Sequence, residues 1–584
     1  MAPVVAILGL AAALRFYNLS GRSLWLDEIV TASTVRLTNL SDLIALRRPN
    51  LVGQSYVDVN QVPLSYLPTW LLRPFGDSEF MLRLPSVVEG TLLVLIVYLL
   101  ARSLFGTRAG LIAALMTAVF PFAVWYSQEA RSYALFMVLT TAQMYGAYMA
   151  VKRGRLIDWV ALAVFSTLNL YTHYLAFLPL AAVGVYIGAF LVARMLKGAS
   201  ARAKAATILA LAVLAVAGAY APYHSLFTTT RSHLALSAAL AAVVLAIIVL
   251  ALVRLRNRWR PLIKSRPEVA GQLAFAVGAG VVVFVAYIPW LPRLRDFIDR
   301  PETSIGRLQL GHSPGLVDVL VVLERLGLSG FLLVALCVGL GVVALQMFRG
   351  SAAESGILIA WLGVSVLLLL RLAGMSVLAI DVRYLAFLVP VAIIVLAIGV
   401  DGAGQGFEWL LRRRWRAGWR VTPATAASVV LVAVLLSQAL PALAASYRAP
   451  KDDWRSTAEH IAASSPPGSY VFAVGDYSDW TVISLSYYLQ RLGTHDAVID
   501  GKFATTELGA ALAATNTSVW GVVIYPSATQ LALLDQPGAE RVDFEDVTDH
   551  IQVVRASDAS LSALEQARTL LRWESQVQPQ ASAL

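Results

Sequence analysis

The sequence predicts a polytopic α-helical membrane protein of about thirteen transmembrane helices, with a water-soluble α/β domain at its C-terminal end. Of its 584 residues, 58% are hydrophobic and only 14% are charged, whereas soluble globular proteins carry about 25% charged residues. The mean hydropathy of the chain is +0.69. These values exclude a soluble enzyme, a disordered chain and a fibrous repeat. The single cysteine, Cys337, excludes an intrachain disulfide and a cysteine metal cluster.

Apolar runs long enough to cross a bilayer recur along the chain. A hydrocarbon core about 30 Å thick needs about 20 apolar residues in a helix. The runs that reach or approach this length lie at residues 2–17, 84–104, 109–126, 132–151, 157–173, 174–193, 205–224, 234–253, 269–291, 327–348, 355–372, 382–400 and 424–445. The first run is not a signal peptide, because no basic segment precedes it and because Arg15 and Phe16 stand where small residues would precede a cleavage site.

Lysine and arginine mark alternate loops between these runs. Cytoplasmic loops of membrane proteins carry an excess of both residues. If the N-terminus is inside, the inner loops hold 21 of them, which are Arg102, Arg108, Lys152, Arg153, Arg155, Arg194, Lys197, Arg202, Lys204, Arg254, Arg256, Arg258, Arg260, Lys264, Arg266, Arg349, Arg412, Arg413, Arg414, Arg416 and Arg420. The short outer loops hold only Arg131 and Arg231. We therefore expect a cytoplasmic N-terminus, an extracytoplasmic C-terminus and no nucleic-acid-binding face.

Two outer loops between the spans are long. Residues 18–83 form a first external loop. Its second half, "QVPLSYLPTWLLRPFG", is apolar, broken by proline and too short to span, as expected of helices that lie along the membrane interface. Residues 292–326 form another external loop.

The C-terminal segment is predicted to form an extracytoplasmic α/β domain. Residues 446–584 contain 9 basic and 17 acidic residues, whereas the rest of the chain contains 37 and 19. The runs "SYVFAVG" and "VWGVVIY" are typical of β-strands, and "DWTVISLSYYLQRLG" and "ELGAALAA" have helical spacing. We therefore divide the chain into a transmembrane domain, residues 1–445, and a soluble domain, residues 446–584.

Charged side chains at the outer ends of the spans are candidates for chemistry, because a charge near hydrocarbon is costly and usually has a role or a partner. Asp27 and Glu28 lie between apolar residues in "SLWLDEIV". A carboxylate there would be partly desolvated and could act as a general base on a hydroxyl. The alternative is that the acid is a solvated loop residue or a helix N-cap. These residues alone favour the general base and this structural interpretation about equally.

Three further loops hold candidates on the same side. Glu129 and Arg131 lie in "YSQEARSYAL", with an ordinary ion pair or a helix-start acid as the alternative. His173 and Tyr174 lie in "YTHYLAF", where a hydrogen-bonded structural histidine is the commoner case. Arg383, in "AIDVRYLAFLVP", is either a fixed cation suited to bidentate phosphate recognition or a snorkelling interfacial arginine. Together these residues suit an amphiphile whose tail lies in the bilayer and whose anionic head group is at the outer surface.

Four motifs, in chain order, resemble those of the polyprenyl-phosphate-dependent GT-C glycosyltransferases, namely "SLWLDE", "GDSEFMLRLPSVVEG", "YSQEARSYAL" and "RYLAFLVP". They extend over residues 15–400 and are similar to the bacterial branch related to protein O-mannosyltransferases and to the lipid A aminoarabinose transferase. The resemblance implies a GT-C fold, an inverting sugar transfer outside the cytoplasm and a place in the bacterial plasma membrane. It is specific for the clan and not for a substrate.

By this resemblance, Asp27 is the first-loop acid that acts as the general base, with Glu28 beside it and Glu129 as a further catalytic acid. The implied substrate-binding residues, for the lipid phosphate and the sugar, are Arg131, Tyr133, His173, Tyr174, Arg383 and Tyr384. Arginines would stabilise the charge that builds on the leaving phosphate. Attack on the opposite face of an oxocarbenium-like state would invert the anomeric centre.

One stretch departs from the family pattern. Many relatives have His-Pro-Pro before the interfacial helix, where this chain has Gln61, Val62 and Pro63. This difference leaves the handling of the acceptor in that loop open. The sequence requires no cofactor, since it has neither a P-loop nor a GxGxxG before a helix. A divalent metal at Asp27 and Glu28 is the weaker alternative, because adjacent acids alone make a poor metal site.

The implied partners are a polyprenyl-phosphate-linked sugar, membrane lipids and a glycan, lipid or protein acceptor, with mannose or another hexose as the family's usual sugar. One rival function is a transporter or flippase of lipid-linked sugars. The sequence shows no paired halves of the kind common in transporters, and its ionisable residues gather at one face. The other rival is a non-catalytic binding relative, against which the presence of Asp27, Glu129 and Arg383 argues.

Overall fold

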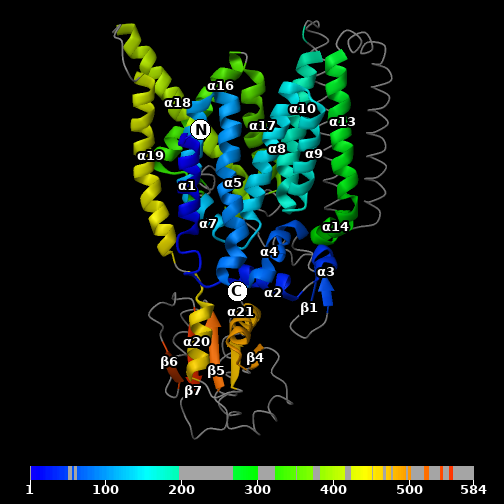
Figure 1. Ribbon diagram of the computed structural model, residues 1–584, viewed down its shortest axis with the longest axis vertical. Coiled ribbons are helices and arrows are strands. Elements are labelled where there is room, and N and C mark those ends of the chain that lie inside the picture. Colours follow the sequence, from blue (N-terminus) through cyan, green and yellow to red (C-terminus); the bar gives the residue numbers. More distant parts are fainter. Residues whose placement is uncertain are drawn as a thin grey trace.

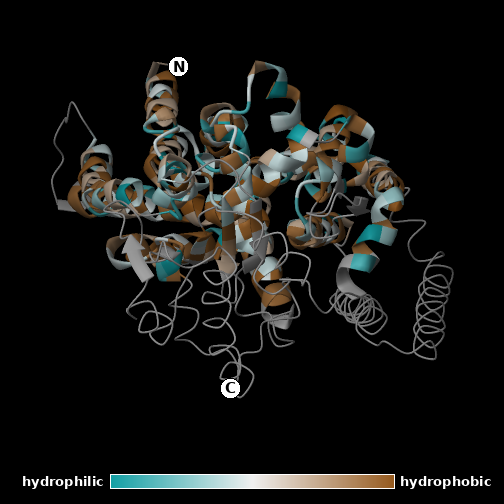
Figure 2. Ribbon diagram, turned by 90° about the horizontal axis from the view of Figure 1, so that it is seen from below, coloured by the Kyte–Doolittle hydropathy of each residue, from teal (hydrophilic) through white to brown (hydrophobic). Residues whose placement is uncertain are grey.

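The protein consists of a bundle of long helices and a smaller domain with a β-sheet at one end of the bundle (Figure 1). The computed structural model describes residues 2–37, 39–49, 55–57, 62–195, 197, 267–299, 323–349, 351–372, 382–414, 422–449, 451–464, 469–474, 478–494, 497–500, 519–524, 539–542 and 551–556. Seen from below, hydrophobic residues cover most of the helices of the bundle (Figure 2).

The helices of the bundle follow the apolar runs of the sequence. They are α1 (Ala2–Phe16), α5 (Glu79–Phe105), α6 (Thr107–Val119), α7 (Pro121–Ser127), α8 (Tyr133–Arg153), α9 (Leu156–Leu170), α10 (Phe177–Met195), α13 (Pro267–Tyr287), α16 (Gly330–Phe348), α17 (Ala352–Leu372), α18 (Val389–Arg414) and α19 (Pro423–Arg448). The most apolar stretches of α8 and α18 are 89% and 94% buried, whereas that of α13 is 17% buried. Helices α8 and α18 therefore form the centre of the bundle and α13 lies at its edge.

The number of membrane spans stays a prediction. In the described part of the chain, seven helices are long and apolar enough to cross a membrane, or up to eight if the bent pair α6 and α7 is one span. The predicted runs at 205–224 and 234–253 lie outside the described residues, and each of the other runs coincides with a helix or a bent pair. Helices α1 and α9 have 15 residues each, too few to reach the usual span length on their own.

The bend between α6 and α7 has an identifiable cause. Pro121 begins α7 and cannot donate a backbone hydrogen bond, and the two helices meet at 57°. The fully buried Arg15 of α1 donates to the carbonyl oxygens of Thr117 and Ala118 at 3.2 and 3.1 Å, and to Ser127 Oγ at 3.1 Å. It thereby satisfies carbonyl groups that the break releases, as a membrane interior requires.

The first external loop lies at the end of the bundle that faces the sheet domain (Figure 1). It contains α2 (Leu26–Leu37), α3 (Leu40–Ala45), the antiparallel pair β1 (Arg47–Pro49) and β2 (Ser55–Val57), η1 (Pro63–Ser65), α4 (Leu67–Leu72) and η2 (Arg73–Phe75). The proline-broken run thus forms short helices, as expected, while Gln61 lies outside the described residues. Further short elements are η3 (Tyr174–Ala176), η4 (Ile288–Trp290), α14 (Leu291–Asp299) and η6 (Val382–Leu388).

The C-terminal domain contains a mixed five-stranded sheet. Its elements are α20 (Trp454–Ser464), β3 (Tyr470–Val474), α21 (Ser478–Leu492), β4 (Ala497–Asp500), β5 (Val519–Ile524), β6 (Ala539–Val542) and β7 (Ile551–Ala556). The strand order is β4-β3-β5-β7-β6, with β3 parallel to β4 and β5, and β7 antiparallel to β5 and β6. Both runs predicted as strands form strands, and "DWTVISLSYYLQRLG" forms most of α21. The run "ELGAALAA" lies outside the described residues.

Candidate active site

Asp27 stands between two arginines at the end of the bundle that faces the C-terminal domain. It lies in the first turn of α2, where the helix dipole favours a carboxylate. Its Oδ2 is 3.1 Å from Arg383 Nη1 and 3.5 Å from Arg131 Nη2. The side chains of Asp27 and Arg383 are 25% and 21% exposed, whereas that of Arg131 is 7% exposed. The carboxylate is therefore accessible to a ligand while its partners are held in place.

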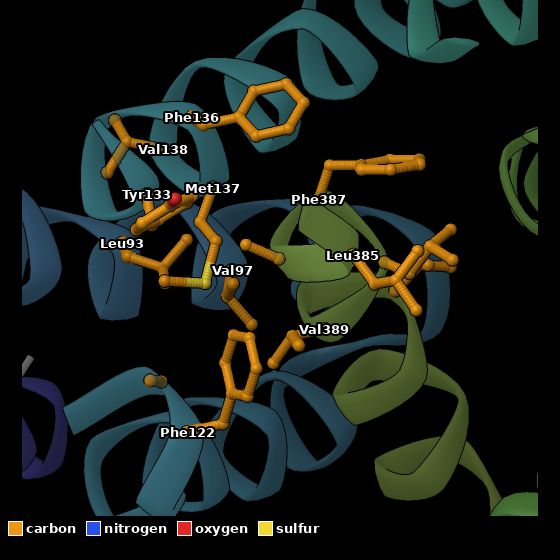
Figure 3. Close-up of a cluster of buried hydrophobic side chains, with 14 of the residues drawn as sticks. Leu93, Val97, Phe122, Tyr133, Phe136, Met137, Val138, Leu385, Phe387 and Val389 are labelled. Carbon is orange, nitrogen blue, oxygen red and sulfur yellow. The ribbon is translucent and has the colours of Figure 1, made fainter. Parts of the chain in front are cut away.

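Packing of apolar side chains holds Arg383 at this position. Arg383 lies in η6, and Figure 3 shows Phe387 of this segment beside Phe136 of α8, with 5.5 Å between their ring centroids, while Leu385 is also buried. The guanidinium of Arg383 lies over the ring of Trp25, with 5.1 Å between its Cζ and the ring centroid. The apolar cluster thus fixes a cation that comes from a distant part of the chain.

Arg131 lies in the tight turn between α7 and α8. Its backbone N–H donates to the carbonyl of Glu129 at 2.8 Å, and its Nη1 donates to the carbonyl of Asp27 at 3.4 Å. Its Nε is buried and makes no hydrogen bond within the described residues. An unsatisfied buried donor on a charged group is rare and costly, so this atom marks a position where an anionic ligand would gain a bond.

Three aromatic rings gather beside the arginines. The ring centroids of Tyr133, His173 and Tyr384 lie 5.8 to 6.4 Å apart. His173 also stacks on Phe136, with 4.7 Å between the ring centroids and 9° between the planes. Aromatic side chains with polar edges and apolar faces suit a sugar ring.

His173 is neutral in this setting. Burial, together with the positive charges of Arg131 and Arg383, lowers its pKa to about 3. Its Nδ1 accepts a hydrogen bond from the backbone N–H of Leu175 at 3.1 Å. The imidazole can therefore stack or hydrogen-bond at neutral pH, but it adds no positive charge for a phosphate.

Tyr174 does not join this group. Its side chain lies beside Trp290 and near Arg293 and Asp296. The neighbouring residue, His173, ends an extended stretch and η3 begins at Tyr174, so the two side chains point to different surroundings. The sequence had placed both among the substrate-binding residues, and the structure brings only His173 to Asp27 and its arginines.

Glu28, the neighbour of Asp27, is fully buried and fully engaged. Arg83 donates to its two oxygens at 2.7 Å each, and the backbone N–H of Ala130 donates to Oε1 at 2.9 Å. Burial alone would raise the pKa of Glu28, but the charges of Arg83 and Lys451 outweigh it and hold the pKa at about 2. This carboxylate stays ionised and is not open to substrate, which favours a positioning role over the catalytic role expected from the sequence.

Glu129 is also buried, at 3% exposure, and faces Lys451. Its Oε1 is 3.0 Å from Lys451 Nζ, and its Oε2 makes no hydrogen bond within the described residues. Burial and the nearby Glu28 raise the pKa of Glu129, although Lys451 opposes the shift. Glu129 therefore belongs with Glu28, Arg83 and Lys451 to an interior group, which is more deeply buried than Asp27.

Arg83 and Lys451 are the site residues that sequence reasoning missed. Arg83 lies within the motif "GDSEFMLRLPSVVEG", where a charge inside an apolar stretch is the signal that could have singled it out. It also donates to the carbonyls of Leu19, Arg22 and Ser23 at 2.8 to 3.0 Å. Lys451 stands in a polar stretch far along the chain, and nothing in its neighbours marks it.

The two groups differ in net charge. Asp27, Arg131 and Arg383 carry one more positive than negative charge, so the group suits an additional anion. Glu28, Glu129, Arg83 and Lys451 contain two acids and two bases and are balanced.

No three-membered group of His, Cys, Asp and Glu able to hold a metal occurs among the described residues. A separate polar cavity of about 460 Å³ lies between the C-terminal ends of α5 and α8, the start of α17 and the middle of α18, lined by Lys152, Glu354 and Asp401 among others. It shares no residue with the Asp27 group.

One family model matches a part of the chain. Residues 63–223 match the family model described as dolichyl-phosphate-mannose-protein mannosyltransferase. That range includes Glu129, Arg131, Tyr133 and His173 and leaves out Asp27 and Arg383. No curated protein sequence matches the chain.

Solved structures give the fold. The archaeal oligosaccharyltransferase AglB from Archaeoglobus fulgidus, in complex with an inhibitory peptide and a dolichol-phosphate, matches with a TM-score of 0.51 and 15% identity over 83% of this chain and 63% of that one. The apo form matches with a TM-score of 0.51 and 14% identity over 90% and 69%. ArnT from Cupriavidus metallidurans bound to undecaprenyl phosphate matches with a TM-score of 0.47 and 15% identity over 95% and 98%.

The fold is that of a GT-C glycosyltransferase. The helical GT-C part of the predicted fold class and the predicted resemblance are thus confirmed, whereas the count of about thirteen spans and the extracytoplasmic place of the C-terminal domain stay predictions. Several apolar helices and the GT-C fold make the chain a multi-pass membrane protein. The chain spans 63% of the length of AglB in the peptide complex.

Proposed function

We propose that this protein is an inverting glycosyltransferase that moves a sugar from a polyprenyl phosphate to an acceptor hydroxyl outside the cytoplasm. The observation that carries the proposal is a partly exposed carboxylate, Asp27, held between Arg131 and Arg383 in a group with excess positive charge. The description of the matching family names a dolichyl-phosphate-mannose donor, and AglB was solved with a dolichol-phosphate. Both support an isoprenoid phosphate as the anion.

The arginines would act on the donor phosphate. A phosphodiester that enters the group offers oxygens to Arg131 and Arg383, including the unsatisfied Nε of Arg131. Charge on the phosphate increases as its bond to the anomeric carbon breaks, and fixed guanidinium groups stabilise that charge without reorganising. Because the phosphate competes with Asp27 for the same cations, donor binding would also release the carboxylate from its ion pairs.

Asp27 would then act on the acceptor. The acceptor oxygen attacks the anomeric carbon on the face opposite the phosphate, and its proton passes to the released carboxylate. A bond from carbon to the acceptor oxygen forms, the bond from carbon to the phosphate oxygen breaks, and polyprenyl phosphate leaves with the electron pair. Tyr133, His173 and Tyr384 supply the aromatic surface on which the sugar would lie.

The remaining features of the proposal follow the sequence. The first external loop and the C-terminal domain lie at the same end of the bundle, as an arrangement with both outside requires. The sugar would be mannose or another hexose, the acceptor a glycan, lipid or protein, and no metal would take part. Glu28 and Glu129 would position the catalytic groups. A tag after Leu584 accessible only from the cytoplasm would contradict this orientation.

A direct assay tests the reaction. The purified protein is incubated in detergent with a panel of polyprenyl-phosphate sugars and candidate acceptors, with and without EDTA, and the release of polyprenyl phosphate is measured. We expect release with at least one donor, unaffected by EDTA and lost in Asp27→Asn. Equal release by the wild type and Asp27→Asn would refute the role of Asp27. If the protein, reconstituted into lipid vesicles, moved intact donor across the vesicle membrane without releasing polyprenyl phosphate, it would be a flippase.

A further inference from the structure

Lys451 connects the C-terminal domain to the interior of the candidate site. It stands at the junction between α19, which ends at Arg448, and α20, which begins at Trp454. Its side chain is only 8% exposed. The ammonium lies 3.0 Å from Glu129 Oε1, 3.6 Å from Glu28 Oε2 and 5.0 Å from the ring centroid of Trp125.

The position of Lys451 is electrostatically necessary to the interior group. Glu28 and Glu129 are both buried, and Arg83 supplies one positive charge. Without Lys451, Arg83 would be the only cation in an ion pair with these two carboxylates among the described residues, with the charges of Arg22 and Arg383 farther away, which is unfavourable in a poorly solvated place. A lysine is suited to this task because its compact ammonium can face both acids at once.

This interior group holds the catalytic parts in register. Glu28 is adjacent to Asp27 in α2, and its Oε1 accepts the backbone N–H of Ala130, which lies between Glu129 and Arg131. Glu28, next to Asp27, and Ala130, next to Arg131, are thus joined by a hydrogen bond, and Lys451 neutralises the carboxylate that makes it. A shift of this carboxylate would move Asp27 and Arg131 together.

The C-terminal domain also binds the segment that leads into α2. The hydroxyl of Tyr488, in α21, accepts the backbone N–H of Leu24 at 2.8 Å. Arg455, in α20, donates to the carbonyls of Ser20 and Gly21 at 3.3 and 3.2 Å. These bonds fix the chain shortly before Asp27 from the side of the soluble domain.

Glu79 at the start of α5 completes the contact. The hydroxyl of Tyr488 donates to Glu79 Oε1 at 3.3 Å, and Arg455 and Arg491 approach the same oxygen at 3.6 Å each. The domain is therefore docked on the ends of α2 and α5 by polar contacts with Lys451 at their inner edge.

We propose that Lys451 is a positioning residue of the transferase site, supplied by the domain junction, so that docking of the C-terminal domain completes the site. This inference deepens the proposed function and rests on it for its catalytic part. It assigns the soluble domain a part in sugar transfer although no catalytic residue has been placed in that domain.

The test compares four variants of the full chain in detergent. Lys451→Met removes the charge and keeps the length, and Lys451→Arg restores the charge. Arg448→Met is the matched control, because it removes an exposed cation three residues before Lys451 that takes no part in the interior group or in the docking contacts described above. Lys451→Met combined with Glu129→Gln removes the lysine and one of the acids that it balances.

The expected results separate the pairing of Lys451 with the interior carboxylates from the mere loss of a cation at the domain junction. Lys451→Met should lower kcat at least tenfold with the KM for the donor within threefold of the wild type, because the arginines that bind the donor remain. Lys451→Arg should retain most of kcat, Arg448→Met should lose less than threefold, and the kcat of the double variant should exceed that of Lys451→Met. Equal losses of kcat in Lys451→Met and Arg448→Met, with no recovery in the double variant, would overturn the proposal.

A second measurement does not depend on sugar transfer. The thermal midpoint of unfolding should fall in Lys451→Met at neutral pH and recover in the double variant, because the unbalanced carboxylate is gone. If the wild type transfers no sugar but the midpoints follow this order, the proposed function fails and the charge pairing of Lys451 stands. If sugar transfer is found but the midpoints do not change, the pairing is refuted.

Discussion

Asp27 and Glu28 are adjacent in the sequence and chemically alike, yet they lie in opposite environments. Asp27 is a quarter exposed and is balanced by two arginines that exceed its charge. Glu28 is completely buried and takes part in a group whose charges cancel. Successive helical residues point about 100° apart, so one step along α2 turns one carboxylate toward the accessible side and the other into the protein.

This difference separates catalysis from support. A group that must bind a substrate anion needs excess charge and access, whereas a group that must hold shape needs balanced charge and complete hydrogen bonding. The first group contains an unsatisfied N–H of Arg131, and the second contains Arg83 with three backbone carbonyls and a carboxylate as acceptors. Variants in the first group should therefore lower activity or donor binding without loss of stability, whereas variants in the second group should lower stability as well as kcat.

The largest effect is expected from Asp27→Asn. Loss of the general base should lower kcat by about 10²- to 10⁴-fold, while the partly exposed amide should leave the free energy of unfolding nearly unchanged. Release of polyprenyl phosphate measures the first quantity and unfolding in mixed micelles measures the second. Asp42→Asn, in the same loop, is the control and should retain activity. An equally inactive control would show that the loop and not the carboxylate is at fault.

Glu28→Gln should lower stability together with activity. It breaks a buried ion pair and leaves Arg83 with unbalanced charge, which costs about 3–5 kcal/mol of stability. Glu354→Gln makes the same change at a partly exposed pair, with Lys152 3.8 Å away, and should cost about 0–1 kcal/mol. Unfolding in mixed micelles measures both. Similar losses in the two variants would mean that the burial of Glu28 does not matter.

A pair of conservative changes compares the arginines directly. Arg383→Lys loses the planar fork of donors and should weaken binding of polyprenyl phosphate about tenfold, or about 1.4 kcal/mol, with little change in stability. Arg83→Lys should lower stability and leave binding of the lipid phosphate largely intact. Binding is measured by product inhibition or by titration of the purified protein. Weaker binding in both variants would show that both groups, and not the Asp27 group alone, contribute to binding of the lipid phosphate.

The last comparison concerns the pH dependence of stability. The folded pKa of His173, about 3, lies below the ordinary value of 6.5, so the histidine contributes stability that is present above pH 6.5 and lost as the pH falls toward 3. Glu28, with a pKa of about 2 against 4.5, loses its contribution only below pH 4.5. Between pH 6.5 and 4.5, His173→Asn should therefore remove a slope of at most about 1.4 kcal/mol per pH unit. Parallel curves for the wild type and the variant would show that His173 is not held neutral.

Much of the bundle could be predicted, because a span depends on local properties. Twenty apolar residues in a row favour a transmembrane helix whatever surrounds them, and the described helices lie on the predicted runs. The helices α1 and α9 are shorter than their runs suggested, since a polar or aromatic turn ends each where the chain must reverse. The two predicted strands and α21 also follow local alternation and helical spacing.

The grouping of side chains followed a different logic. Sequence reasoning placed Asp27, Arg131 and Arg383 on one side of the membrane, and the structure places a guanidinium nitrogen of each arginine within 3.5 Å of Asp27 Oδ2. It gave Glu28 and Tyr174 the same standing as their neighbours, although the structure turns both away from that group. It passed over Arg83 and found no reason to consider Lys451.

The sequence by itself determined that this chain inserts into a membrane, which runs become helices and which charged residues collect at one face, because hydropathy and charge act on each segment alone. Only the tertiary structure decided which of two adjacent carboxylates is accessible and which cation balances each acid. Those outcomes depend on helix rotation and on contacts between residues hundreds of positions apart, and neither can be recognised from the amino acids that surround a residue in the sequence.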